Sequence, residues 1–168
     1  MGITQLLPIP PGQGGYTFGE VRRDVAAQVA ATNSAAFNQR AAGQTANALT
    51  ESSVPLSVVH DSTALAHLLY SVHVVRCPSL DQAQARNHGG LQVKCAPEIM
   101  IQLMYRLRPG SQIIDEDLAS ECARVVCGSV MRIPYIEVFN EIYRPRVTPD
   151  GEYQLIEQVC TAVIDLQL

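Results

Sequence analysis

The chain has 168 residues, of which 47% are apolar and 17% are charged. This length favours a single domain, and this composition excludes a disordered chain because it supplies enough apolar side chains for a core. The formal net charge of −4 argues against general nucleic-acid binding, which needs a basic face. The same net charge is compatible with a surface that DNA passes without being bound.

The cysteines and the N-terminal residues indicate a soluble protein in a cytosolic setting. Five cysteines without a secretory leader favour reduced thiols rather than a disulfide framework. Residues 1–11 lack the charged segment and the long apolar run of a signal peptide. No apolar run reaches the ~20 residues that a membrane-spanning helix requires, so we expect no membrane among the partners.

The first residues are rich in proline and glycine, which predicts an extended N-terminal arm at residues 1–16. In a monomer such an arm is a frayed terminus, whereas in an assembly it can dock on a neighbour and become ordered. Thr17 and Glu20 then form a capping box, and three valines follow at helical spacing. This pattern predicts a helix from residue 17 to about residue 32.

The middle of the chain carries weaker signals. Residues 33–53 are mostly small and polar, which indicates either a second helix of low stability or a long excursion. Residues 55–59 predict a short strand, and the alternation over residues 68–76 predicts a longer one. The polar residues 78–90 predict a loop.

The clearest strand signal covers residues 91–108, with apolar side chains on one face and a second face that becomes more polar toward Arg108. The residues expected on the apolar face are Ile99, Ile101, Leu103, Tyr105 and Leu107. Asp115 then begins a helix with acidic residues in its first turn, where the helix dipole favours negative charge. This helix is expected to end near Met131, before Pro134.

A hairpin closes the sequence, with arms at residues 135–144 and 153–168 and a turn at residues 148–151. The order of all these elements predicts an α+β fold. We expect a four- to five-stranded mixed or antiparallel sheet with helices packed on one face. The predicted organisation is therefore an N-terminal arm at residues 1–16 and a single α+β domain at residues 17–168.

The sequence contains no set of residues with the spacing of a catalytic, cofactor or metal site. Cys122 and Cys127 lie about 140° apart around a helix, so they do not share a face, and buried thiols are the simpler interpretation. Walker A, dinucleotide-binding and nucleophile-elbow sequences are absent. We expect no metal, no cofactor and no enzymatic activity. His60 beside Asp61 is the one pair that leaves a small hydrolase open.

Four arginines form a candidate interface: Arg106, Arg108, Arg144 and Arg146. They fall at the ends of the two strands that flank the second predicted helix. If those strands are neighbours, the four guanidinium groups gather at one edge of the sheet. They would then bind carboxylates of a partner protein or phosphates. Ordinary solvation of the strand ends is the alternative.

The C-terminal half of the chain, over residues 91–168, resembles a family of phage proteins. The residues that carry the resemblance read IMIQLMYRLRPGSQIIDEDLASECARVVCGSVMRIPYIEVFNEIYRPRVTPDGEYQLIEQVCTAVIDLQL. Their order of strand, helix and hairpin is similar to that of the tail-terminator and related head–tail neck proteins of long-tailed bacteriophages and gene-transfer particles. The resemblance rests on element order and on the character of the last strand, and residues 33–53 have no counterpart in the family.

Membership would imply a structural virion subunit that forms a ring, commonly a hexamer, at the head–tail junction. The ring would terminate the tail tube and join it to the connector. Its partners would be the tail tube protein and the head connector or adaptor protein, with genomic DNA only passing through the lumen. Such a subunit would be assembled in the host cytoplasm and located in the virion. Another assembly or adaptor subunit, such as a secretion-system component, and a small hydrolase with His60 and Asp61 are the alternatives.

Overall fold

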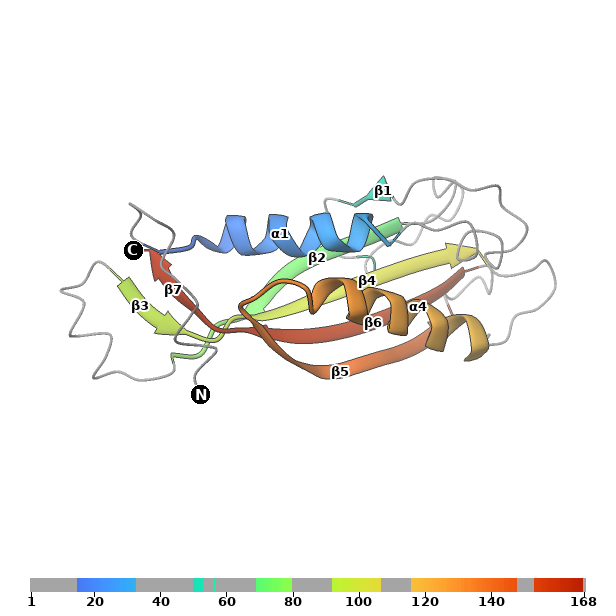
Figure 1. The fold of residues 1–168 in the computed structure, drawn as a ribbon. Coiled ribbons are helices and arrows are strands. Elements are labelled where there is room, and N and C mark those ends of the chain that lie inside the picture. The colour runs from blue at the N-terminus through green and yellow to red at the C-terminus, as the bar shows by residue number, and fades with distance from the viewer. Residues whose placement is uncertain are drawn as a thin grey trace.

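The structure, a computed structural model, describes residues 15–32, 50–52, 56, 69–79, 92–106, 116–147 and 153–167. Helices and strands in these residues follow the order shown in Figure 1. They are α1 (Phe18–Ala30), β1 (Thr50–Glu51), β2 (Leu69–Arg76), β3 (Gln92–Cys95), β4 (Glu98–Arg106), α4 (Glu116–Val130), β5 (Ile136–Val147), β6 (Tyr153–Ala162) and β7 (Ile164–Gln167).

The described strands form two sheets. The larger has five strands in the order β1-β2-β4-β6-β5, and β3 pairs with β7 in a sheet of two. Only the short β1 runs parallel to its neighbour, and the other pairs are antiparallel. The predicted α+β fold with a mixed sheet of four to five strands is therefore confirmed.

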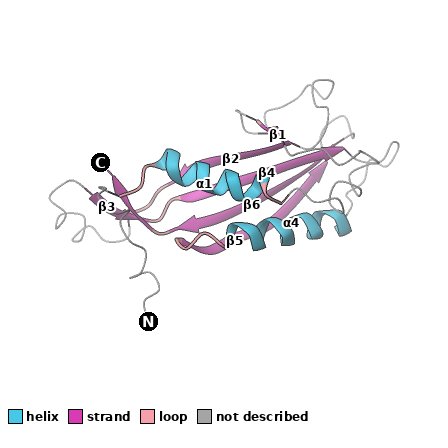
Figure 2. Ribbon diagram, turned by 45° about the horizontal axis from the view of Figure 1, so that its top comes forward, coloured by secondary structure: helices cyan, strands magenta, loops and turns pink. Residues whose placement is uncertain are grey.

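Both described helices lie on the same face of the five-stranded sheet, as the prediction required (Figure 2). The side chains that they bury form one core with the inward positions of β2, β4 and β6. Ile99, Ile101 and Leu103 of β4 are almost completely buried in this core, and Val126 of α4 and Val25 of α1 pack from the helices. The alternation read from the sequence in residues 99–103 thus gives the correct inward face.

The first helix begins where the capping box predicts. The Thr17 hydroxyl accepts a hydrogen bond from the Glu20 backbone N–H at 3.2 Å, and a Glu20 carboxylate oxygen accepts one from the Thr17 backbone N–H at 3.0 Å. These two bonds satisfy amides that the first turn would otherwise leave unpaired. The prediction of a helix from residue 17 to about residue 32 is confirmed.

The segment predicted as one strand at residues 91–108 is two strands, because the chain is interrupted at Ala96 and Pro97. Proline has no backbone N–H and cannot donate to the ladder, although the Pro97 carbonyl still accepts from the Ala162 N–H at 3.0 Å. The opposite strand is interrupted at Val163, whose N–H turns away to the Tyr135 carbonyl at 2.8 Å. The last predicted strand, residues 153–168, is therefore also divided.

The pairing of these two long strands nevertheless keeps one register across the interruption. Glu98 pairs with Thr161 on one side of it and Cys95 pairs with Ile164 on the other, so both strands advance by the same number of residues. The β3–β7 sheet is thus a continuation of the β4–β6 ribbon. It extends past the end of the five-stranded sheet (Figure 1).

The last residues of the predicted arm pair with the small sheet. Tyr16 forms a parallel bridge with Leu166, its N–H donates to the Asp165 carbonyl, and its own carbonyl accepts from the Gln167 N–H, both at 2.7 Å. Gly15 precedes it with a positive φ of 105°. The chain therefore enters α1 along the edge of β7, and residues 1–14 of the predicted arm lie outside the described residues.

We expect Gly15→Ala to destabilise the protein by about 1–3 kcal/mol, the usual cost of a residue held in a disfavoured backbone conformation. A Cβ atom at Gly15 would lie 2.4 Å from the Asp165 carbonyl oxygen. Gly128→Ala in α4 is the matched control, because a Cβ atom there meets nothing within 4 Å and alanine favours helix by about 0.5–1 kcal/mol. Urea denaturation should show the two alanine variants shifting in opposite directions; equal shifts would contradict the close approach.

Several predicted segments lie wholly or largely outside the described residues. They are most of the loop at residues 78–90, the turn at residues 148–151, and residues 33–49 of the segment predicted as a second helix or a long excursion. Within the excursion, Thr50 and Glu51 form β1. Leu56 is the one described residue of the strand predicted at residues 55–59, and it lies in a short helical turn rather than in a strand.

Candidate assembly interface

The structure separates the arginines that the sequence suggested would gather. Arg106 in β4 is opposite Tyr153, whereas Arg144 and Arg146 in β5 are opposite Glu157 and Leu155. The condition under which all four would gather at one edge, that these two strands are neighbours, is not met, because β6 lies between them. Adjacent strands are about 4.8 Å apart, so roughly 10 Å separates β4 from β5. Arg108 and the side chains of Arg106 and Arg144 lie outside the described part of the chain.

Arg146 is held by an acidic residue of its own chain. Its guanidinium group forms an ion pair with Glu157, whose carboxylate is almost completely buried. A buried carboxylate is costly without a partner, so this arginine compensates a charge inside the molecule. Arg146 therefore has a structural role that the sequence did not reveal, because the pairing depends on the register between β5 and β6.

Glu157 belongs to a hydrogen-bond network on the face of the sheet opposite the helices, called here the second face. The Gln102 amide donates to the other carboxylate oxygen of Glu157 at 3.2 Å. The Gln102 carbonyl oxygen accepts from the Ser71 hydroxyl at 3.1 Å and from the Leu56 N–H at 2.8 Å. The network thus connects neighbouring strands β2, β4, β6 and β5, and it ties Leu56 to the sheet.

This network lies in the covered half of the second face. Ser71, Gln102 and Glu157 are buried, and so are the apolar neighbours Met104 and Leu155. The alternation over residues 99–107 puts Gln102 and Met104 on this face but does not reveal the network. The polar residues of this network occupy strand positions that alternate with core positions. They can be recognised as a network only when the strand order is known.

The other half of the second face is open. Val138 of β5 pairs with Thr161 of β6, and Thr161 pairs with Glu98 of β4, so their side chains project on the same side as Glu157. Val138 is 48% exposed, and Val75, in the irregular end of β2 beside Glu98, is 49% exposed. These two are the most exposed of the large apolar side chains that the structure describes.

Glu98 of β4 and Thr161 of β6 lie between these two valines on the second face. Met100 and Val159 are paired on the second face and are only partly covered. Arg76 forms an ion pair with Glu98 within this surface at 3.5 Å. We call the set Val75, Met100, Val138 and Val159 the open apolar end. A surface on which exposed apolar side chains stand among a few polar and charged groups is typical of a protein–protein contact.

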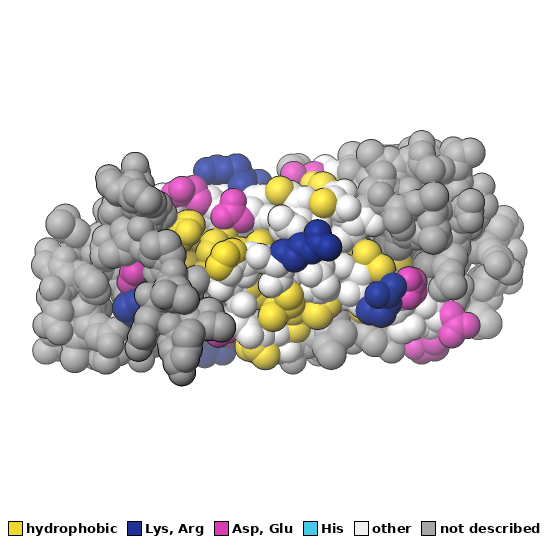
Figure 3. Space-filling model, viewed as in Figure 1, with side chains coloured by type: hydrophobic (Ala, Val, Ile, Leu, Met, Phe, Trp, Pro, Cys, Tyr) yellow, Lys and Arg dark blue, Asp and Glu magenta, His cyan; other side chains and the backbone are white. Residues whose placement is uncertain are grey.

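The helix face differs from the open apolar end. Its visible side carries positive and negative side chains scattered among apolar ones, without a large patch of one sign (Figure 3). One ion pair there joins Arg124 to Glu121 within α4 at 2.7 Å. A mixed surface of this kind suits solvent, so the helix face gives no comparable indication of a contact.

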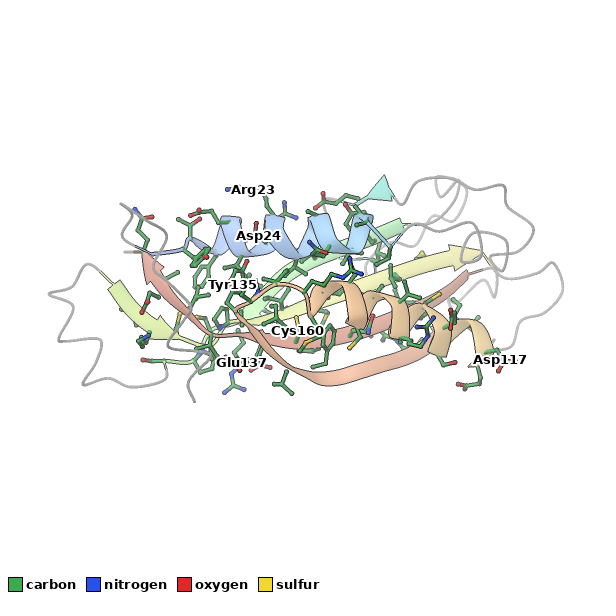
Figure 4. All side chains as sticks on the ribbon, in the orientation of Figure 1. Arg23, Asp24, Asp117, Tyr135, Glu137 and Cys160 are labelled. Carbon is green, nitrogen blue, oxygen red and sulfur yellow. The ribbon has the colours of Figure 1, made fainter. Side chains whose placement is uncertain are left out.

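One polar contact on the helix side fixes α1 to the turn that precedes β5. The Tyr135 hydroxyl donates to the Asp24 carboxylate at 2.6 Å, and the two side chains point toward each other in Figure 4. The Tyr16 ring packs against Tyr135 with 4.9 Å between the ring centres. Burial raises the pKa of Tyr135, and the hydrogen bond to Asp24 and the negative charge of that carboxylate raise it further.

This raised pKa predicts a loss of stability at alkaline pH. The unfolded tyrosine ionises near pH 10.0, while the folded hydroxyl stays protonated. The stability that Tyr135 contributes is therefore fully present below about pH 10 and is lost as the pH rises through the folded pKa. We expect Tyr135→Phe to lower the free energy of unfolding by about 0.5–1.5 kcal/mol at neutral pH.

The free energy of unfolding of the wild type and of Tyr135→Phe is measured from about pH 9 to about pH 11. The difference between the two proteins isolates the contribution of Tyr135 from that of other groups that titrate at alkaline pH. The difference between the two proteins should shrink as the pH rises. A difference that stays constant over this range would contradict the link between the hydrogen bond and the pKa of Tyr135.

The residues considered for chemistry are not brought together in the described part of the chain. His60 and Asp61 lie outside the described residues. All five cysteines are free; Cys122 is buried in the core, and Cys127 is half-buried. Among the described residues, no three His, Cys, Asp or Glu side chains are grouped so that they could hold a metal ion.

The chain matches no protein-family model and no curated protein. Neither described helix combines the length and the apolar character needed to cross a membrane.

Proposed function

We propose that this chain is a non-enzymatic assembly subunit whose open apolar end contacts a second copy of the same chain. The exposure of Val138 and Val75 on the second face is the observation that carries the proposal. Apolar side chains left half-exposed cost free energy in water, and burial against another subunit recovers about 25 cal/mol for each Å² covered. The Arg76–Glu98 pair within this surface is largely neutral as a pair, so it does not repel a second copy.

Within this class we propose a ring subunit at the head–tail junction of a long-tailed virus or gene-transfer particle. The order β4, α4, β5 and β6 supports this proposal, because it is the order of strand, helix and hairpin on which the resemblance rests. In this role the ring terminates the tail tube and joins it to the head connector or adaptor protein. The net charge of −4 suits a lumen through which DNA passes without being held tightly.

A closed ring requires a contact that repeats by rotation. The open apolar end is confined to one end of one face, so it can serve as one half of such a contact. The β3–β7 ribbon extends beyond the five-stranded sheet (Figure 1) and offers a second element that can reach a neighbour. An assembly built in this way leaves the helix face available for solvent or for further partners.

The test of this proposal has two parts. Light scattering after gel filtration and negative-stain imaging of the full chain should give one assembly of uniform mass, seen as rings with an open centre. Antibody labelling of intact particles should then place the chain between head and tail. Label on the capsid surface or along the tail tube would overturn the proposed position. A chain that remains monomeric even with the tail tube and connector proteins present would overturn the assembly itself.

A further inference from the structure

Two of the five cysteines are brought together where the five-stranded sheet meets the β3–β7 sheet. After β2 ends, the chain turns alongside the end of β3: Ser79 forms an antiparallel bridge with Cys95, and the Ala96 N–H donates to the Pro78 carbonyl at 2.8 Å. In this register Cys77 is opposite Pro97, so it lies diagonally across from Cys95. Side chains at diagonal positions of an antiparallel pair project to the same side, and a hydrogen bond between these two thiols brings their sulfur atoms within reach of each other.

The two thiols share one environment but differ in access to solvent. Cys95 is only 2% exposed and belongs to the core, whereas Cys77 is half-buried and packs against that core from outside. Burial raises the pKa of Cys95 to about 12, and a hydrogen bond with the Cys77 thiol contributes to the rise. Cys95 is therefore kept protonated and out of reach of solvent, and any reagent from solvent meets Cys77 first.

We propose that Cys77 and Cys95 form a redox-sensitive pair that closes to an intrachain disulfide, with a small-molecule disulfide such as oxidised glutathione as the oxidant. The Cys77 thiolate attacks one sulfur of the oxidant, and a mixed disulfide forms while one glutathione thiolate leaves. Cys95 then gives up its proton and attacks the Cys77 sulfur, and the second glutathione thiolate leaves. Two protein thiols are oxidised and one small disulfide is reduced to two thiols.

The bond would join the end of β2 to the end of β3. The described contacts at this junction include the Ser79–Cys95 bridge, the Ala96–Pro78 hydrogen bond and a hydrogen bond from the Ser79 hydroxyl to the Lys94 carbonyl. A covalent link there would fix the β3–β7 ribbon relative to the five-stranded sheet. It would also restrict the unfolded chain, so the oxidised protein should melt at a higher temperature than the reduced one.

A second pair of cysteines provides the comparison. Burial, the larger effect, and the nearby Cys127 of α4 raise the pKa of the Cys160 thiol on β6 to about 12. No strand register aligns these two residues, because one is on a helix and the other is in the sheet beneath it. We therefore expect oxidation to link Cys77 with Cys95 and to leave Cys127 and Cys160 unlinked.

Peptide mapping of the full chain tests this proposal. The reduced protein is incubated with oxidised glutathione, its remaining thiols are blocked before unfolding, and it is digested with trypsin without reduction. Cleavage after Arg76 and Lys94 places the two thiols at the start of separate peptides, residues 77–86 and 95–106. We expect these two peptides to appear joined, with the loss of two hydrogen atoms, and to separate on reduction.

Two variants make the outcome decisive. Cys77→Ala should abolish the joined peptide and the rise in melting temperature, while Cys127→Ala should leave both unchanged. Cys77 is half-buried, so its replacement should leave the fold intact, and the melting curve of the reduced variant checks this. Persistent glutathione adducts on Cys77, or joined peptides that involve other cysteines in place of Cys95, would overturn the proposal.

Discussion

Gln102→Leu is expected to lower the free energy of unfolding by about 2–4 kcal/mol, because each buried polar group left without its partner costs about 1–3 kcal/mol. Gln102 is fully buried and serves three partners: it accepts from Ser71 and from the Leu56 N–H, and it donates to Glu157. Leucine fills a similar volume but offers no hydrogen bond. The buried carboxylate of Glu157 would then depend on Arg146 alone within this network.

Met104→Leu is the matched control for this substitution. Met104 is buried on the same face of the same strand, and a swap between methionine and leucine usually costs less than about 1.5 kcal/mol. Urea denaturation of both variants at neutral pH gives the comparison. If Gln102→Leu were no less stable than Met104→Leu, the network would not stabilise the fold in the way described.

Local signals in the sequence predicted those elements that depend on neighbouring residues. The capping box at Thr17 defines the start of α1 because its two hydrogen bonds join residues three positions apart. The alternation at residues 99–103 defines the buried face of β4, since successive side chains of a strand point to opposite sides. In both cases the physical cause is contained in a few consecutive residues.

The placement of the arginines could not be predicted in the same way. Whether Arg146 meets Arg106 or Glu157 depends on which strand lies beside β5, and that is fixed by pairing between distant parts of the chain. The insertion of β6 between β4 and β5 leaves no local signature. The interruption at Pro97, in contrast, has a local signature, because a proline has no N–H and is rarely tolerated inside a paired strand. The alternating residues on either side of Pro97 nevertheless favoured the prediction of one continuous strand.

Val138→Asp is expected to abolish contact between copies while leaving the fold intact. Val138 is 48% exposed in the single chain, so an aspartate at this position remains solvated and costs the monomer little. In an interface, the same carboxylate would be removed from water among Val75, Met100 and Val159, without a partner. An unpaired charge in such a position costs several kcal/mol, and each 1.4 kcal/mol weakens association tenfold.

Met131→Asp is the matched control, since Met131 is also a large apolar residue and is 42% exposed at the end of α4. Both variants should melt within a few degrees of the wild type, which shows that the fold is preserved.

The most direct measurement is the sedimentation velocity of the wild type, Val138→Asp and Met131→Asp at matched concentrations. We predict a single large species for the wild type and for Met131→Asp, and a monomer for Val138→Asp. A Val138→Asp protein that sediments with the wild type would contradict the assignment of the open apolar end as the contact between copies.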